Sequence, residues 1–98
     1  MYELEVPPLQ SPEDASEMIR FWIDGADDAV TLNIGSMGDG EPEQWGMILA
    51  DIARHAMNGM LQKDPSFSKA DLVKRIEAGY MGRMREKDLT SGTLQGGS

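Results

Sequence analysis

The chain has 98 residues, 27% of them charged and 40% hydrophobic, with a formal net charge of −8 and no cysteine. The length predicts a single domain, and the composition is typical of an ordinary globular protein and not of a disordered one. The lack of cysteine excludes disulfides, thiolate metal ligands and a cysteine nucleophile, and it favours a cytoplasmic location.

The first apolar residues, Tyr2, Leu4 and Val6, alternate with acidic residues. This period of two predicts a half-buried extended segment. Pro7 and Pro8 end it, because neither can donate an amide hydrogen to a neighbouring strand. Whether residues 2–6 join a sheet as a third strand is left open by the pattern.

Two further segments, residues 17–23 and 29–34, also alternate and predict strands. Turn-forming residues 24–28 join them, so an antiparallel hairpin is the simplest arrangement. A lone hairpin is not stable in water, and we therefore expect the helices that follow to pack on one of its faces. That face carries the apolar residues Ile19, Phe21, Ile23, Val30, Leu32 and Ile34.

The opposite face of the hairpin carries Met18 and Trp22. If the helices cover the first face, these two side chains are left for a partner, and a tryptophan beside a methionine is a candidate interface anchor. Coverage of Trp22 by the N-terminal segment is the alternative.

A first long helix is predicted from Pro42 to about Leu61, since proline suits the first helical position. Met57 and Leu61 extend its apolar surface sideways, and so wide an arc is typical of a helix buried on more than one side. Both residues are candidates for a protein interface. The main apolar stripe consists of Trp45, Ile48, Leu49, Ile52, Ala56 and Met60.

The polar residues of this helix form a narrow wedge of Asp51, Arg54, His55 and Asn58. An aspartate four residues before a histidine can orient a general base or help to bind a metal. A metal needs three or four ligands, however, and Arg54 is a poor neighbour for one. We therefore favour a solvent-edge network in which Asp51 pairs with His55 and Arg54. No catalytic residue, cofactor site or metal site is predicted.

A second helix is predicted from Lys69 to about Lys87, with Ser68 and Asp71 forming its capped start. Its basic residues raise the alternative of nucleic-acid binding, which the acidity of the whole chain disfavours. Residues 89–98 have the composition of a flexible tail. No apolar run approaches the roughly 20 residues that a membrane helix needs.

Three motifs resemble those of a small uncharacterised family, a domain-of-unknown-function family found mainly in alphaproteobacteria. They are Val-Pro-Pro at residues 6–8, Ile-Arg-x-x-Ile at residues 19–23 and Trp-Gly-x-x-Leu-Ala-Asp-Ile-Ala-Arg-His at residues 45–55. The resemblance extends over residues 4–84. It implies a cytoplasmic bacterial protein of one compact domain, and it implies no activity. It favours a function for the polar wedge somewhat more than the spacing does.

The sequence therefore predicts an α+β domain over residues 1–88, with an antiparallel hairpin, or three strands, and two helices packed on one face. The function it favours is non-catalytic: a small interaction module that forms a homodimer or docks on another protein. The alternative is a protein that binds a small ligand or a metal, or a minor enzyme, at the wedge formed by Asp51, Arg54, His55 and Asn58.

Overall fold

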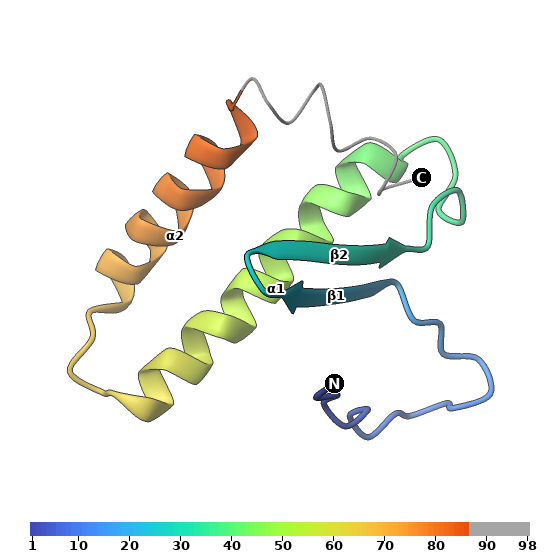
Figure 1. Cartoon of the computed structure of the whole chain (residues 1–98), viewed down its shortest axis with the longest axis horizontal. Helices are drawn as coiled ribbons and strands as arrows, with labels where there is room; N and C mark the ends of the chain where they lie inside the picture. Colours follow the sequence, from blue (N-terminus) through green and yellow to red (C-terminus); the bar gives the residue numbers. More distant parts are fainter. Residues whose placement is uncertain (87–98) are drawn as a thin grey trace. The chain divides into compact units, whose positions relative to one another are not determined.

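The computed structural model describes residues 1–86, and the chain divides into two compact units, Met1–Asn33 and Ile34–Ser98. The predicted α+β class, with an antiparallel hairpin and two helices, is confirmed. The elements follow one another in the order β1 (Ile19–Asp24), β2 (Asp27–Leu32), α1 (Glu41–Lys63) and α2 (Lys69–Met84), as Figure 1 shows.

The first unit contains the hairpin, in which Ile19 lies opposite Leu32 and Asp24 lies opposite Asp27. The connection is a two-residue turn, and the predicted five-residue loop is too long because aspartates extend both strands. Gly25 has a φ of 64°, which a glycine adopts at no steric cost. A glycine at the first of two turn positions matches the strand twist of a tight hairpin.

The strand register places Ile19, Phe21 and Ile23 on one face with Val30 and Leu32, as the alternation predicts. This face remains largely open, since Phe21 is 58% exposed and Ile23 is 77% exposed. The packing of the helices on it stays a prediction. Within the described chain the sheet has two strands, and residues 2–6 do not form a third.

The second unit contains the two helices, which run in opposite directions and are joined by residues 64–68 (Figure 1). The Asp64 carboxylate accepts hydrogen bonds from the Ser66 hydroxyl at 2.6 Å and its amide at 3.1 Å. These bonds lower the pKa of Asp64. Ser68 caps α2 as predicted, because its hydroxyl accepts from the Asp71 amide at 3.3 Å. The helix ends at Met84, before the predicted boundary.

Only two hydrophobic side chains are buried among the described residues: Met57 of α1, at 6% exposure, and Leu72 of α2, at 3%. Both lie in the part of the helical pair that is close to the connecting turn. So small a core is unusual for a chain of this length. The prediction of one domain over residues 1–88 stays a prediction, and the predicted tail at residues 89–98 lies outside the described residues.

Candidate functional site

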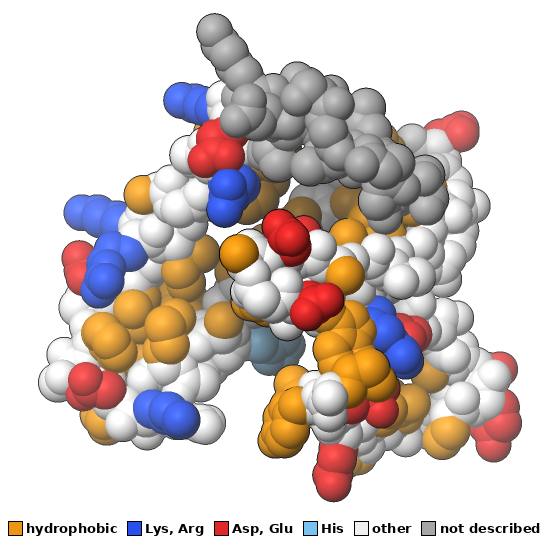
Figure 2. Space-filling view, in the orientation of Figure 1, with side chains coloured by type: hydrophobic (Ala, Val, Ile, Leu, Met, Phe, Trp, Pro, Cys, Tyr) orange, Lys and Arg blue, Asp and Glu red, His pale blue; other side chains and the backbone are white. Residues whose placement is uncertain are grey.

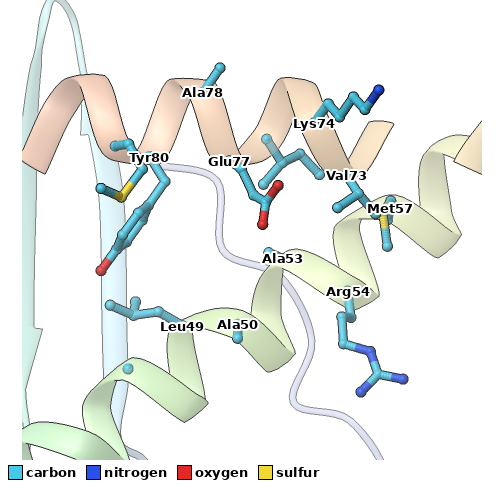
Figure 3. Close-up of a pocket in the computed structure, with 13 residues that line it drawn as sticks. Leu49, Ala50, Ala53, Arg54, Met57, Val73, Lys74, Glu77, Ala78 and Tyr80 are labelled. Carbon is cyan, nitrogen blue, oxygen red and sulfur yellow. The ribbon is translucent and has the colours of Figure 1, made fainter. Parts of the chain in front are cut away.

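An apolar groove with a volume of about 790 Å³ runs between α1 and α2. It results from the antiparallel arrangement of two amphipathic helices whose apolar stripes turn toward each other (Figure 3). Its apolar lining includes Leu49, Ala53 and Met57 of α1 and Val73, Tyr80 and Met81 of α2.

The two buried side chains of the helical pair lie near the connecting turn. Met57 and Leu72 are buried beside the turn, whereas Leu49 is 42% exposed and Tyr80 is 44% exposed farther along the helices. Met84, at the end of α2, is 59% exposed. The helices therefore stabilise each other near the turn and leave apolar surface uncovered toward their other ends.

Glu77 lies on the wall of this apolar groove. Figure 3 shows its carboxylate directed from α2 toward α1. No hydrogen bond or ion pair to Glu77 is formed by the residues that the structure describes. A carboxylate that becomes buried without a cation or a hydrogen-bond donor is costly. Any protein that closes the groove must therefore leave Glu77 hydrated at the rim or pair it with a positive charge.

Glu77 is absent from the residues that the sequence singled out. The signal is present in the helical spacing, because Glu77 follows Val73 by four residues and precedes Tyr80 by three. A charged residue at that position interrupts an apolar stripe, whereas the predicted wedge of α1 collects polar residues on a separate side.

Glu41, at the start of α1, forms a hydrogen-bonded clamp. Its carboxylate accepts from the Gly35 amide at 2.9 Å, the Met37 amide at 3.3 Å and the Trp45 indole Nε1 at 2.9 Å. The Gly35 amide lowers the pKa of Glu41 most, followed by the Trp45 indole, while partial desolvation opposes them. The clamp fixes the glycine-rich segment before α1 to the first turns of the helix.

This clamp also occupies the Gly35 and Met37 amides of the glycine-rich segment before the helix, so neither is free to bind an anion. The negative charges of Glu41 and Glu43, which both lie in the first turn of α1, also disfavour an anion there. The contacts at the helix start therefore have a structural role: they hold the glycine-rich segment against α1. The sequence signal for it is the spacing of four residues between Glu41 and Trp45.

The predicted polar wedge is placed on the exposed surface of α1. Asp51, Arg54, His55 and Asn58 are all exposed. The expected pairs of Asp51 with His55 and with Arg54 are absent from the ion pairs of residues 1–86, so that expectation is wrong. Only Arg54 reaches the groove, where it lines the edge and points away from the interior (Figure 3).

The four predicted interface residues divide into two groups. Met18 and Trp22 of the hairpin are half-buried. Arg20 shares their face and forms an ion pair with Glu3 at 3.6 Å, which brings the N-terminal segment close to that face. In the helical unit Met57 is buried and Leu61 is half-buried. Met57 therefore joins the two helices, and neighbouring groove residues offer more surface to a partner.

The model of one protein family, described as a domain of unknown function (DUF5076), matches residues 3–88. The chain belongs to this family. The match covers most of both units of the DUF5076 chain and confirms the predicted resemblance to a small uncharacterised family. No curated protein and no solved structure matches the DUF5076 chain.

Two further observations concern residues 1–86 of the DUF5076 chain. No three His, Asp or Glu side chains in this part of the chain converge as the ligands of a metal ion would. None of its helices combines the length and the apolar character needed to span a bilayer.

Proposed function

We propose that this DUF5076 chain is a small non-catalytic interaction module that acts as a homodimer or docks on another protein. One observation carries the proposal: two side chains are buried in the described chain, while large apolar side chains on both units are exposed. Uncovered apolar surface of this extent is typical of a protein that associates. Figure 2 shows such side chains on α2, beside its lysine and arginine residues.

The wide apolar surface of α1 is a second observation that supports the proposal. Ala53 lines the groove, whereas Ile52 lies one residue earlier, about 100° around the helix. Ile52 is 49% exposed. A helix that presents apolar residues over so wide an arc is typically covered on more than one side. A neighbouring helix on one side alone does not account for the composition of α1.

Light scattering combined with circular dichroism tests the proposal. We expect the wild-type chain to associate reversibly at micromolar concentration, and Trp22→Ala to weaken that association if the hairpin takes part. A chain that stays monomeric while its helices are fully formed would contradict the proposal, because its apolar surface would then require no partner.

The alternative function places a small ligand, a metal or a minor enzymatic activity at the polar wedge of Asp51, Arg54, His55 and Asn58. Its support is the helical spacing of these residues and their shared exposure on α1. His55→Ala separates the two proposals. Under the interaction proposal this substitution changes neither folding nor metal content of the purified protein.

The proposal includes a bacterial cytoplasmic location. It is supported by the cysteine-free composition and by the resemblance described above. Fractionation of cells that produce the full chain tests the location, and recovery outside the cytoplasmic fraction would contradict it.

A further inference from the structure

We propose that α2 packs in antiparallel orientation against α2 of a second copy of the chain, along the edge of the groove, so that two helical pairs assemble through this contact. The inference rests on the proposed function and names the partner as the chain itself. The surface involved is the side of α2 that carries Val73, Lys74, Glu77, Ala78 and Met81, all of which line the groove and are exposed.

The helix is self-complementary in shape along this side. In an antiparallel contact centred between Lys74 and Glu77, each residue is level with the partner residue that is equally far from this centre in the opposite direction along the sequence. Met81, near the middle of this side, then faces Ala70 of the partner subunit. This pair joins a large side chain to a small one, which allows two helices to approach closely. Met81 is 42% exposed and Val73 is 37% exposed, so both have surface to bury.

The charges are self-complementary along the same side. Lys74 faces Glu77 of the partner subunit, and the two-fold axis repeats the pair, as a contact between identical surfaces requires. Glu77 forms no ion pair within the described chain, and neither does Lys74. The second copy therefore supplies the cation that the groove carboxylate needs when the groove is closed.

The other sides of α2 do not offer this match. Asp71 and Arg75 are not among the residues of this contact side, and their charged groups are 4.0 Å apart within the same chain. Their charges are thus already neighbours in the single chain, and substitution of Arg75, which lies farther from the contact side, provides a control on the same helix.

Charge exchange tests the contact in the full-length chain by sedimentation equilibrium. Lys74→Glu and Glu77→Lys place like charges opposite each other, and we expect each to raise the dimer dissociation constant about 10-fold or more. Mixing the two variants creates complementary helices and should restore a dimer that contains one chain of each. The double variant K74E/E77K should also dimerise. Arg75→Glu makes the same change of charge outside the contact side and should leave the dimer intact.

The outcomes separate this inference from the proposed function. A dimer that neither Lys74→Glu nor Glu77→Lys weakens, and that Trp22→Ala dissociates, overturns the α2 contact and leaves the interaction module standing. A monomer with incomplete helices also overturns it and favours a different protein as the partner. A monomer with complete helices overturns both. Loss of association in each single variant without rescue by mixing contradicts the pairing of Lys74 with Glu77.

Discussion

The hairpin unit, Met1–Asn33, and the helical unit, Ile34–Ser98, differ in how far their own contacts stabilise them. The helical unit has a clamp at Glu41, a cap at Ser68 and two buried side chains. The hairpin unit has a tight turn and a regular ladder, yet none of its residues is buried. A two-stranded hairpin alone is marginal in water. The comparison indicates that the helical pair is the framework of the chain and that the hairpin depends on being covered.

The largest expected effect concerns the buried end of the helical pair. Leu72→Ala removes a side chain that is 3% exposed, and we expect it to destabilise the fold by about 2–5 kcal/mol. Urea unfolding, followed by the helical circular-dichroism signal, measures this change. Met47→Ala is the control, because Met47 is 59% exposed on α1 and should change stability little. Equal losses in the two variants would show that the helices do not pack at Leu72.

The next largest effect concerns the tight turn of the hairpin. Gly25→Val forces a β-branched residue to a φ of 64°, and we expect a cost of about 1–2 kcal/mol in hairpin stability. Weaker cross-strand nuclear Overhauser effects between Trp22 and Ala29 would report it, since these residues are opposite each other. Ala26→Val is the control, because the backbone there has no positive φ. A hairpin equally populated in both variants would argue against the tight turn.

A smaller effect is expected at the start of α1. Glu41 has a lowered pKa, so its carboxylate stabilises the folded state at pH values above its ordinary pKa of 4.5. This contribution is lost as the pH falls from that value through the lower pKa of the folded state. We therefore expect Glu41→Gln to lower the melting temperature at neutral pH, by a difference from wild type that shrinks in acid.

The control for the clamp is Glu43→Gln, which removes an exposed charge from the same helical turn. Thermal unfolding of both variants at several pH values distinguishes a hydrogen-bonded clamp from a general effect of charge near the helix dipole. If the two variants lose the same stability at every pH, the clamp has no specific role.

The smallest effect is expected at the polar wedge. His55 is exposed and forms no ion pair in residues 1–86. We expect His55→Ala to change the free energy of unfolding by less than about 0.5 kcal/mol, as is usual for exposed positions. Calorimetric titration with zinc should give the same absence of binding for wild type and variant. Zinc binding that disappears in His55→Ala would favour the alternative function.

Local chemistry made much of this fold predictable from sequence. Alternation identified both strands, Pro42 marked the first turn of α1, and Ser68 marked the start of α2. Each of these signals acts between residues that are close in the chain. The class and the order of the elements follow from such signals.

The exposure of apolar residues could not be predicted in the same way. Periodicity shows that Phe21 and Ile23 share a face, but it does not show what covers that face. For the same reason periodicity predicts the apolar stripe of α1 but not the groove, and it places Met57 at an interface although this side chain is buried between the helices. The roles of Glu41 and Glu77 depend on neighbours that only the folded chain brings together.

Amide hydrogen exchange of α2 at two protein concentrations most directly tests the claim that a second chain completes the helical framework. We expect the amides of residues 73–81 to exchange more slowly at high micromolar than at low micromolar concentration, and Lys74→Glu to remove this difference. Exchange rates in α2 that are the same at both concentrations would contradict it.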